Sequence, residues 1–434
     1  MIYKHEIKNT YTTVTDKFVK STFFGNNNVP YNLLIFILWP FLSFLISVFN
    51  FSDKSLRKFI LAFLVLFGAT GVLSNKTHDA LGHMRYFDEI ARRPLSDLWI
   101  IVTDLFTGGK APVTDLYATF VNFFISRLTD NASYMFAFHA LIFGIFYLKS
   151  TSLLYDEFRG NKNINTFLFL LLFVFIIPID KIQYVRFWTA AWIFIYATLK
   201  LLKNKNIKHF ILLFLACFVH ISFILPVAIA LIYFVVGNRI NIYFIILLIS
   251  YILPGLITSQ ISQFGSLGAG ELLDNKVSAY ALNETYIADR VARFEVRSWY
   301  IRFQVPFLHY ALLFVLSYLY IKRKKFIQDN YQLSLFSFLV LFLAFVNFGY
   351  QIASVGERFI LLFFSFGCVF LYRHFSLNDK KQLSWLTYIL IIPSSLWLLV
   401  QLRFMLDFMN AFMIVGNPLF FLFEDTNITL LDLK

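Results

Sequence analysis

Long apolar runs separated by short polar segments dominate the chain from residue 31 onward. A helix that crosses a bilayer needs about 20 mostly apolar residues, and flanking Lys or Arg side chains can extend a shorter run by reaching to the interface. Ten runs fit this pattern, and none of them contains Asp, Glu, Lys or Arg. These runs are Tyr31–Phe49, Phe59–Ser74, Tyr134–Leu148, Asn165–Pro178, Phe187–Leu199, Ile240–Ile257, Phe303–Tyr320, Leu333–Tyr350, Phe359–Leu371 and Leu383–Val400.

A further apolar segment, His209–Val235, is interrupted by His220-Ile221-Ser222 and contains Pro226. This pattern predicts either one long broken helix or a re-entrant pair of helices. Two stretches, Leu95–Phe106 and Thr114–Leu128, are amphipathic and too polar to span, so we expect them to lie in the interface plane.

The predicted fold is an all-α, polytopic transmembrane bundle of about 10–12 spans with amphipathic and re-entrant helices. The expected organisation is a polar N-terminal arm (1–30), a transmembrane domain (31–401) with outer loops 76–131 and 258–302 and the re-entrant segment 209–235, and a C-terminal interfacial segment (402–434).

Composition supports this class. The chain of 434 residues is 59% hydrophobic and only 15% charged, and it contains 56 Phe. A soluble domain has about 25% charged residues, and a disordered chain lacks apolar and aromatic side chains, so both classes are excluded. The formal net charge of +13 does not indicate nucleic-acid binding in a chain of this kind.

The charge instead predicts orientation, because Lys and Arg are enriched in cytoplasmic loops. Alternate loops carry nearly all of the excess positive charge, and the loops between them are almost neutral. The basic loops are 50–58, 149–164, 200–208, 238–240, 321–332 and 373–381. We therefore expect these loops in the cytoplasm and the amino terminus outside. The segment His209–Val235 lies between two basic loops, which favours a re-entrant segment or a short helical hairpin.

Candidate chemistry gathers in the other set of loops. Arg290, Arg293 and Arg297 fall at i, i+3 and i+7 and would form one cationic face of a helix. Guanidinium groups match phosphate oxygens, so this face suits a diphosphate; it would equally suit solvent or anionic lipid head groups.

Arg186 and Arg358 each precede an apolar run, where an arginine either snorkels to the interface or binds an anion in a shared cavity. His220, at the break in the apolar segment, is a catalytic candidate or a packing histidine.

Two carboxylates are candidates for a general base. Asp79 opens the first outer loop, where it could also cap a helix, and Glu295 lies among the loop arginines. Sugar stacking is expected of Tyr86, Tyr286 and Tyr300, although tyrosines also form interfacial belts. The group His78, Asp79 and His83 has metal-like spacing but offers only three ligands, so we expect no metal and no cofactor. The sequence contains no P-loop, dinucleotide fingerprint or catalytic-triad pattern.

Four short motifs appear in order along the chain. They are Asp79-Ala80-Leu81-Gly82-His83-Met84-Arg85-Tyr86-Phe87, Val185-Arg186-Phe187-Trp188-Thr189-Ala190, Phe218-Val219-His220-Ile221-Ser222 and Gly356-Glu357-Arg358-Phe359. Together they resemble the EpsG/Wzy group of bacterial polysaccharide polymerases, over roughly Ser74 to Phe359. His83 occupies a place where that family more often has an aromatic residue.

The resemblance implies a membrane glycosyltransferase-like (GT-C-like) fold in the bacterial inner membrane with its active site facing the periplasm. It also implies a substrate, an oligosaccharide linked to undecaprenyl diphosphate, and assembly of O-antigen or exopolysaccharide. Membrane lipid and a chain-length regulator protein are further candidate partners, whereas nucleic acid is not expected.

In this interpretation Arg186, Arg290, Arg293 and Arg358 bind the diphosphate, His220 assists, and Asp79 or Glu295 deprotonates the acceptor hydroxyl. Two other classes stay open: an O-antigen ligase or other lipid-linked-sugar glycosyltransferase, and a transporter or flippase.

Overall fold

The structure is a computed structural model, and it describes residues 28–73, 78–107, 115–157, 164–253, 292, 294–327, 329–350, 355–377, 384–417, 428–430 and 432. These residues form an all-α bundle, as predicted, and within them the only extended pairing is an isolated bridge between Asn410 and Thr429. The helices are α2 (Asn28–Leu38), α3 (Pro40–Phe49), α4 (Arg57–Ala69), α5 (His78–Ala91), α6 (Asp97–Thr107), α7 (Leu116–Ile125), α8 (Ala132–Glu157), α9 (Ile164–Ile176), η1 (Ile179–Tyr184), α10 (Phe187–Lys203), α11 (Ile207–Val219), η2 (Ile221–Phe223), α12 (Ile224–Val236), α13 (Ile240–Ile252), α17 (Trp299–Ile321), α18 (Arg323–Phe326), α19 (Asn330–Phe348), α20 (Val355–Leu377), α21 (Ser384–Phe408) and α22 (Phe412–Val415).

Six segments within the described ranges are long and apolar enough to cross a membrane. They are Ala132–Glu157, Asn165–Tyr184, Trp299–Ile321, Asn330–Phe348, Gly356–Leu377 and Trp385–Phe408. The other apolar helices in these ranges are shorter, so the chain is a multi-pass membrane protein that combines spanning helices with shorter ones.

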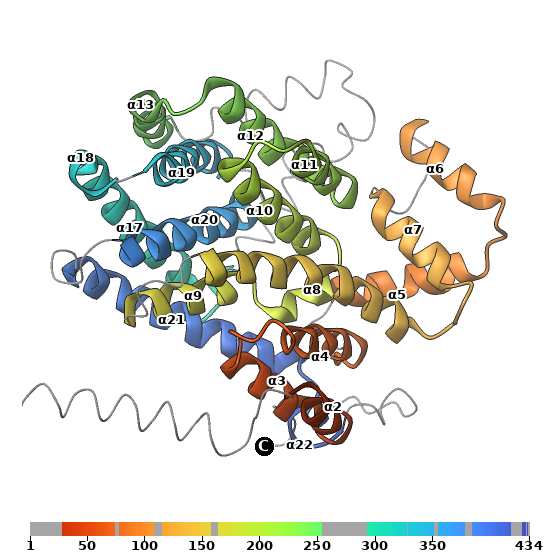
Figure 1. The fold of residues 1–434 in the computed structure, drawn as a ribbon. Coiled ribbons are helices and arrows are strands. Elements are labelled where there is room, and N and C mark those ends of the chain that lie inside the picture. Colours follow the sequence, from red (N-terminus) through yellow and green to blue (C-terminus); the bar gives the residue numbers. More distant parts are fainter. Residues whose placement is uncertain are drawn as a thin grey trace, which may run out of the picture.

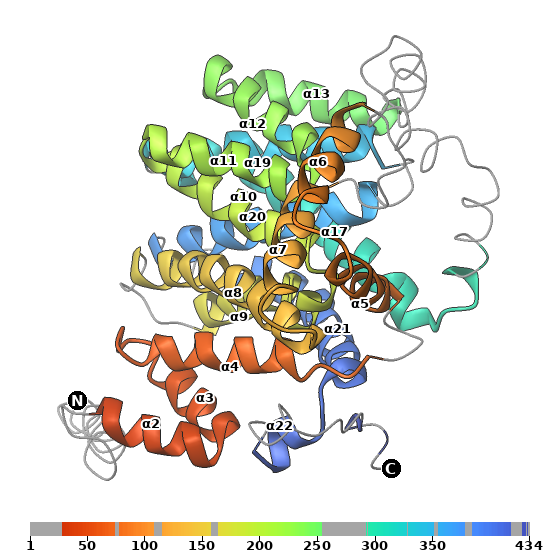
Figure 2. The same ribbon diagram turned by 90° about the vertical axis from the view of Figure 1, so that its right-hand side faces the viewer.

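The centre of the bundle is built by α10, α19 and α20, which are buried on nearly all sides. A helix that is apolar all round is stable only in such an interior or in lipid. By contrast, only 33% of the apolar window in α17 and in α21 is buried, as expected of helices that face lipid. Figures 1 and 2 show α5, α6 and α7 close together on one flank of this bundle.

The first apolar run does not form the single span that its length predicts. The helix ends at Leu38 and a new one begins at Pro40, because proline cannot continue a helix but is well suited to its first turn. The two helices fold back on each other: the Asn32 side chain donates to Ser47 Oγ at 2.9 Å, and Ser43 Oγ donates to the Asn32 carbonyl at 3.2 Å. Residue 28 therefore lies at the same end of the bundle as the loop that leads into α4.

The interrupted segment folds as a helical hairpin with its tip at His220. Lys205, before α11, donates to the Phe234 carbonyl near the end of α12 at 3.5 Å, and the Phe210 and Phe234 rings lie 5.5 Å apart. The start of α11 and the end of α12 are therefore neighbours. Each helix has 13 residues, or roughly 20 Å. His220 is therefore one full helix length away from the start of α11 and from the end of α12.

The bundle has two polar ends. One end, here called the basic end, joins loops that the charge pattern assigns to the same side. Its ion pairs link Arg57 to Asp156 through two hydrogen bonds of 2.8 and 2.7 Å, Lys203 to Glu157 at 2.7 Å, and Arg373 to Asp329 at 2.5 Å. The other, here called the site end, contains the starts of α8, α10 and α20 and the tip of the hairpin.

The predicted C-terminal interfacial segment begins at residue 402, and in the structure α21 continues to Phe408. Beyond it, α22 packs against α3, and the Trp39 indole N–H donates to the Ile414 carbonyl at 2.7 Å. Figures 1 and 2 show α2, α3 and α22 grouped at one edge of the molecule. The two ends of the described chain therefore stabilise each other.

Candidate functional site

A buried carboxylate lies at the centre of the site end. Asp115 precedes α7 in the position of a helix cap and is only 2% exposed, but its side chain makes no capping hydrogen bond. Instead Oδ2 accepts from Nη1 of Arg186 at 2.8 Å, and Oδ1 accepts from the backbone N–H of Ile221 at 3.0 Å. Asp115 thus joins the start of α10 and the tip of the hairpin to α7.

Arg186 is placed by the turn that follows the apolar helix α9. Pro178 ends that run, η1 makes a tight turn, and Arg186 stands directly before α10. Its side chain is 27% exposed, so the Arg186 side chain stays partly accessible. A guanidinium has five N–H donors, and its hydrogen bond to Asp115 uses one of them.

His220 has an extended backbone between α11 and η2, with φ −152° and ψ 119°. Its Nδ1 accepts from the backbone N–H of Ser222 at 3.3 Å and lies 2.8 Å from Ser222 Oγ. Because Nδ1 is an acceptor, the neutral ring carries its proton on Nε2. Nε2 is 4.0 Å from Asp115 Oδ2, so the N–H side of the ring faces the Asp115–Arg186 pair.

Phe187 brings a third basic side chain to the same place. The guanidinium carbon of Arg358 lies 5.0 Å from the centre of the Phe187 ring, and the His220 ring meets that ring edge-on at 5.2 Å. Arg358 is in the first turn of α20 and is half-buried. We refer to Asp115, Arg186, Phe187, His220 and Arg358 as the Arg186 cluster.

Gly356 allows α20 to begin where it does. A Cβ at this position would lie 2.6 Å from the Tyr350 Cα and 2.7 Å from the Tyr350 carbonyl oxygen, both of which belong to the backbone. Only glycine permits so close an approach. Gly356 therefore fixes how closely the first turn of α20, which carries Arg358, packs against the end of α19.

Two buried histidines, His83 and His139, lie near Arg186. His83 on α5 is 6% exposed and His139 on α8 is 1% exposed. The His139 Nδ1 lies 2.9 Å from the Tyr117 hydroxyl, and its Nε2 is 3.4 Å from Asn122 Oδ1. Burial, and after it the nearby positive charge of Arg186, holds the pKa of His83 well below its usual value. His83 is therefore neutral at neutral pH.

Asp79 lies near the cluster but not in it. It is exposed in the first turn of α5, and the neighbouring Ala80 packs in one apolar group with Val185, the residue before Arg186. Within the described residues no hydrogen bond or ion pair connects Asp79 to the cluster.

Tyr86, the other expected site residue on α5, points into the protein. It is 7% exposed, its hydroxyl is 3.3 Å from Thr119 Oγ1 on α7, and burial raises the pKa of the phenol. In this position Tyr86 stabilises the packing of α5 on α7, and its contact with a sugar stays a prediction.

The rear-loop candidates are only partly described. Glu295 is exposed, and in the described residues no ion pair joins it to the Arg186 cluster. Tyr300 is half-buried at the start of α17, with its ring edge-on to Trp299 at 5.9 Å. Three expected site residues lie outside the described residues: Arg290, Arg293 and Tyr286. Their roles stay predictions.

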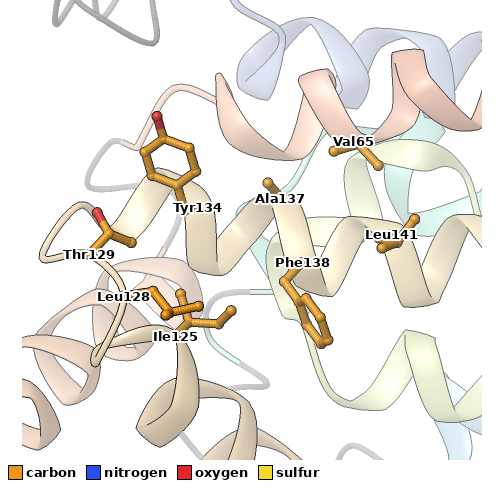
Figure 3. Close-up of a pocket in the computed structure, with 8 residues that line it drawn as sticks. All are labelled: Val65, Ile125, Leu128, Thr129, Tyr134, Ala137, Phe138 and Leu141. Carbon is orange, nitrogen blue, oxygen red and sulfur yellow. The ribbon is translucent and has the colours of Figure 1, made fainter.

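An apolar groove of about 570 Å³ opens at the site end, between α4, the end of α7 and the start of α8. Figure 3 shows the side chains that line it, and Thr129 and the Tyr134 hydroxyl are the polar groups among them. The lining residues are Val65, Ile125, Leu128, Thr129, Tyr134, Ala137, Phe138 and Leu141. His139 lies on the same turns of α8 as Ala137, Phe138 and Leu141, which line the groove, but it faces Tyr117 and Asn122 instead.

Sequence reasoning located Arg186, His220 and Arg358 by their positions at the ends of apolar runs, but it missed Asp115. The missed signal is an acid directly before an amphipathic stretch, which is also the pattern of an ordinary helix cap. Its partners Arg186 and Ile221 are 71 and 106 residues away, and no local pattern reports contacts at that separation.

The fold and the cluster together define a multi-pass helical membrane protein with a cationic polar site at one end of its bundle. The model of the EpsG family matches residues 56–414, which is most of the chain, and the protein therefore belongs to the EpsG family. The family places it among the Wzy-like, glycosyltransferase-like polymerases of polysaccharide biosynthesis. No curated protein and no solved structure matches the chain.

Proposed function

We propose that this protein is a polysaccharide polymerase, of the O-antigen type, that moves a growing glycan from undecaprenyl diphosphate to the terminal sugar of a lipid-linked repeat unit. The observation that carries the proposal is the convergence of Arg186, His220 and Arg358 at one end of the bundle. These residues come from three segments far apart in sequence, and in a membrane protein such polar groups are kept for a function.

The proposed reaction needs charge stabilisation more than covalent chemistry. The acceptor hydroxyl oxygen attacks the anomeric carbon, a new glycosidic C–O bond forms, and the bond from that carbon to the diphosphate oxygen breaks. The electron pair leaves with the diphosphate, where Arg186 and Arg358 stabilise the developing negative charge, with Arg290 and Arg293 as further proposed ligands. Guanidinium forks fit phosphate oxygens in pairs.

His220 is proposed to donate from Nε2 to the diphosphate or to the bridging oxygen. The hydroxyl proton needs an acceptor. We assign this role to Asp79, which is exposed on α5 and precedes Ala80, a residue that packs in one apolar group with Val185. Glu295 stays the alternative, and it would otherwise orient the loop arginines. Tyr86, Tyr286 and Tyr300 stay the proposed sugar contacts.

The apolar groove provides a place for the hydrocarbon tail of such a substrate. It is lined almost entirely by apolar side chains, and it lies at the site end, next to the helix turns that carry His139. We propose that the polyprenyl chain occupies it while the diphosphate reaches the cluster. The cluster then faces the periplasm of a bacterial inner membrane, since the opposite end holds the basic loops.

The test replaces Arg186 with Ala in a glycan-producing cell and separates the glycan by length. Loss of one charge-stabilising donor costs roughly 3–4 kcal/mol of barrier, or about a hundredfold or more in rate, so we expect the ladder of chain lengths to collapse to single repeat units. The control is Arg403→Ala at the same end, because Arg403 pairs with Asp407 on its own helix at 3.0 Å and is 46% exposed. A full ladder from Arg186→Ala would reject the proposal.

Purified protein separates the remaining classes. A polymerase forms longer glycan from lipid-linked repeat units alone, whereas a ligase requires a different acceptor. A transporter moves the substrate without any change in glycan length.

A further inference from the structure

Asp115 is the one strongly buried carboxylate in the described part of the site end that binds two other elements at once. Its side chain has no exposed surface beside Arg186. Removing an ionised carboxylate from water costs several kcal/mol unless partners compensate. Here one oxygen binds the Arg186 guanidinium and the other binds the Ile221 amide, so groups that surround the proposed diphosphate site contribute to the compensation.

The geometry leaves Arg186 oriented but still available. Asp115 contacts Nη1, while part of the Arg186 side chain stays exposed. A guanidinium that is held along one edge presents its other N–H groups in a fixed plane. Without Asp115, the long arginine side chain would sample several rotamers, and binding an anion would have to restrict them.

The second oxygen fixes the hairpin relative to Arg186. Its partner, the Ile221 N–H, directly follows His220, whose Nε2–H side faces the same carboxylate. The distance between the guanidinium and the imidazole is therefore set by Asp115, although these groups belong to different helices.

We propose that Asp115 is a positioning residue of the polymerase site: it holds Arg186 and the hairpin tip in register, so that the remaining guanidinium donors and His220 address the same lipid-linked diphosphate. This inference rests on the proposed function. Asp115 itself neither contacts substrate nor transfers a proton. Because it acts through Arg186, its effect on the reaction must depend on Arg186 being present.

The experiment is a double-mutant cycle on the full-length protein in proteoliposomes supplied with lipid-linked repeat units. Asp115→Asn keeps an oxygen for the Ile221 amide and removes the charge that orients Arg186. A misplacement of about 1 Å can cost on the order of a hundredfold in rate, so we expect kcat to fall about 30- to 100-fold in the wild-type background. In the Arg186→Ala background we expect a further change of less than about twofold, since the group being positioned is gone.

A purely structural carboxylate would behave differently: it would lower the rate by the same factor in both backgrounds, and that result would overturn the proposal. Asp180→Asn is the matched control, because Asp180 is a 1% exposed carboxylate paired with Lys181 at 3.0 Å in η1. We expect this control to lower the melting temperature without the Arg186-dependent loss of kcat.

Asp115→Glu keeps the charge but displaces it by one methylene, and it serves if the asparagine variant does not fold. A severalfold loss of kcat that vanishes in the Arg186→Ala background supports positioning, whereas a wild-type rate would show that charge alone suffices and would reject it.

Binding of farnesyl diphosphate to each variant gives a second readout that does not need turnover. We expect Asp115→Asn to weaken it about as much as Arg186→Ala does, and an unchanged affinity would contradict the proposal. If wild-type protein binds the probe but forms no polymer, the proposed function fails. If wild-type protein forms polymer and Asp115→Asn has the same kcat and the same affinity for the probe, only the positioning role fails.

Discussion

At the scale of single residues, the site depends on side chains that hold other side chains. Phe187 contacts both Arg358 and His220 through its ring. Asp115 binds both Arg186 and the Ile221 backbone through its carboxylate. Neither of these holding residues is recognisable as functional from its own chemistry, because a phenylalanine at the start of an apolar helix and an aspartate before an amphipathic one are ordinary. That Arg186, His220 and Arg358 are candidate site residues could therefore be predicted from the sequence, while the side chains that hold them together could not.

We expect Phe187→Leu to reduce polymerisation more than it reduces stability. A cation–π contact is worth about 0.5–2 kcal/mol, so loss of the ring should lower the rate by roughly 2- to 30-fold as Arg358 loses its fixed position. The matched control is Phe194→Leu on the same helix, since Phe194 packs against Phe223 and Phe366 at 5.8 and 6.0 Å and no cation of the described residues lies over its ring. Rates and melting temperatures are measured for both. Equal rates would show that the ring does not place Arg358.

His83 gives a prediction about pH. Its pKa in the folded protein is depressed below the ordinary 6.5, so below that pH the unfolded chain binds more protons than the folded one. Stability is therefore fully present above about pH 6.5 and decreases as the pH falls below it.

We expect His83→Gln to reduce the loss of melting temperature between pH 7.5 and 5.5, measured in detergent at fixed ionic strength. The variant keeps a polar side chain of similar reach but cannot be protonated. Parallel curves for wild type and variant would contradict the role assigned to His83.

At the scale of helices, the apolar pattern predicted where most elements lie, and it failed where backbone chemistry intervened. It treated residues 31–49 as one span, but Pro40 divides them into a hairpin. The break at His220 was predicted, because the polar step His220-Ile221-Ser222 interrupts an otherwise continuous apolar run. What the pattern could not supply was packing: residues that touch across helices, such as Gly68 and Ala140, leave no periodic signal.

The contact between α4 and α8 depends on small residues. A Cβ on Gly68 would lie 2.4 Å from the Ala140 Cβ and 3.0 Å from the Phe136 carbonyl oxygen, and helices in membranes commonly approach closely at such positions. We expect Gly68→Ala to destabilise the protein by about 1–3 kcal/mol, the usual cost of overpacking.

The matched control is Gly82→Ala on α5, where an added Cβ meets no described atom within 4 Å. There we expect no loss, or a gain of about 0.5–1 kcal/mol from the higher helix propensity of alanine. Thermal unfolding of both variants checks the pair, and similar melting temperatures would argue against close packing at Gly68.

Filling the groove tests whether it binds the substrate tail. Ala137 on α8 lines the groove (Figure 3), and the indole of Ala137→Trp would project into part of its volume. Because the tail binds equally in the ground state and the transition state, we expect KM to rise several-fold with kcat little changed. Ile249→Trp on the exposed face of α13, where Ile249 is 41% exposed, controls for a bulky surface residue. An unchanged KM for Ala137→Trp would place the tail elsewhere.

At the scale of the whole molecule, the charge pattern and the ion pairs describe the same two ends. Loops that were assigned to one side by their Lys and Arg content are joined in the structure by Arg57–Asp156, Lys203–Glu157 and Arg373–Asp329. The α2–α3 hairpin changes one expectation. The alternation of loops predicts the amino terminus on the outer side, whereas the hairpin brings residue 28 to the basic end. The helix break at Pro40 accounts for the difference, because it removes one crossing.

Single cysteines in a variant without Cys217 and Cys368 can check this orientation. Ser55 and Ser298 are both exposed, at the basic end and before α17 respectively. We expect a membrane-impermeant maleimide added to intact spheroplasts to label Ser298→Cys, and to label Ser55→Cys only after the cells are opened. The reverse pattern would invert the topology and place the Arg186 cluster in the cytoplasm.

The hairpin of α11 and α12 has a consequence for how this architecture can vary. Because it enters and leaves the bundle at the same end, it adds an even number of crossings at any depth, and every later helix keeps its direction whether the hairpin is longer, shorter or deleted. Insertions of whole helical turns in both arms would raise or lower His220 without inverting the rest of the protein. The position of the His220 imidazole along the bundle can therefore change without changing the direction of any other helix. Arg186 and Arg358 stand at the starts of the central helices α10 and α20, so their positions cannot change in this way.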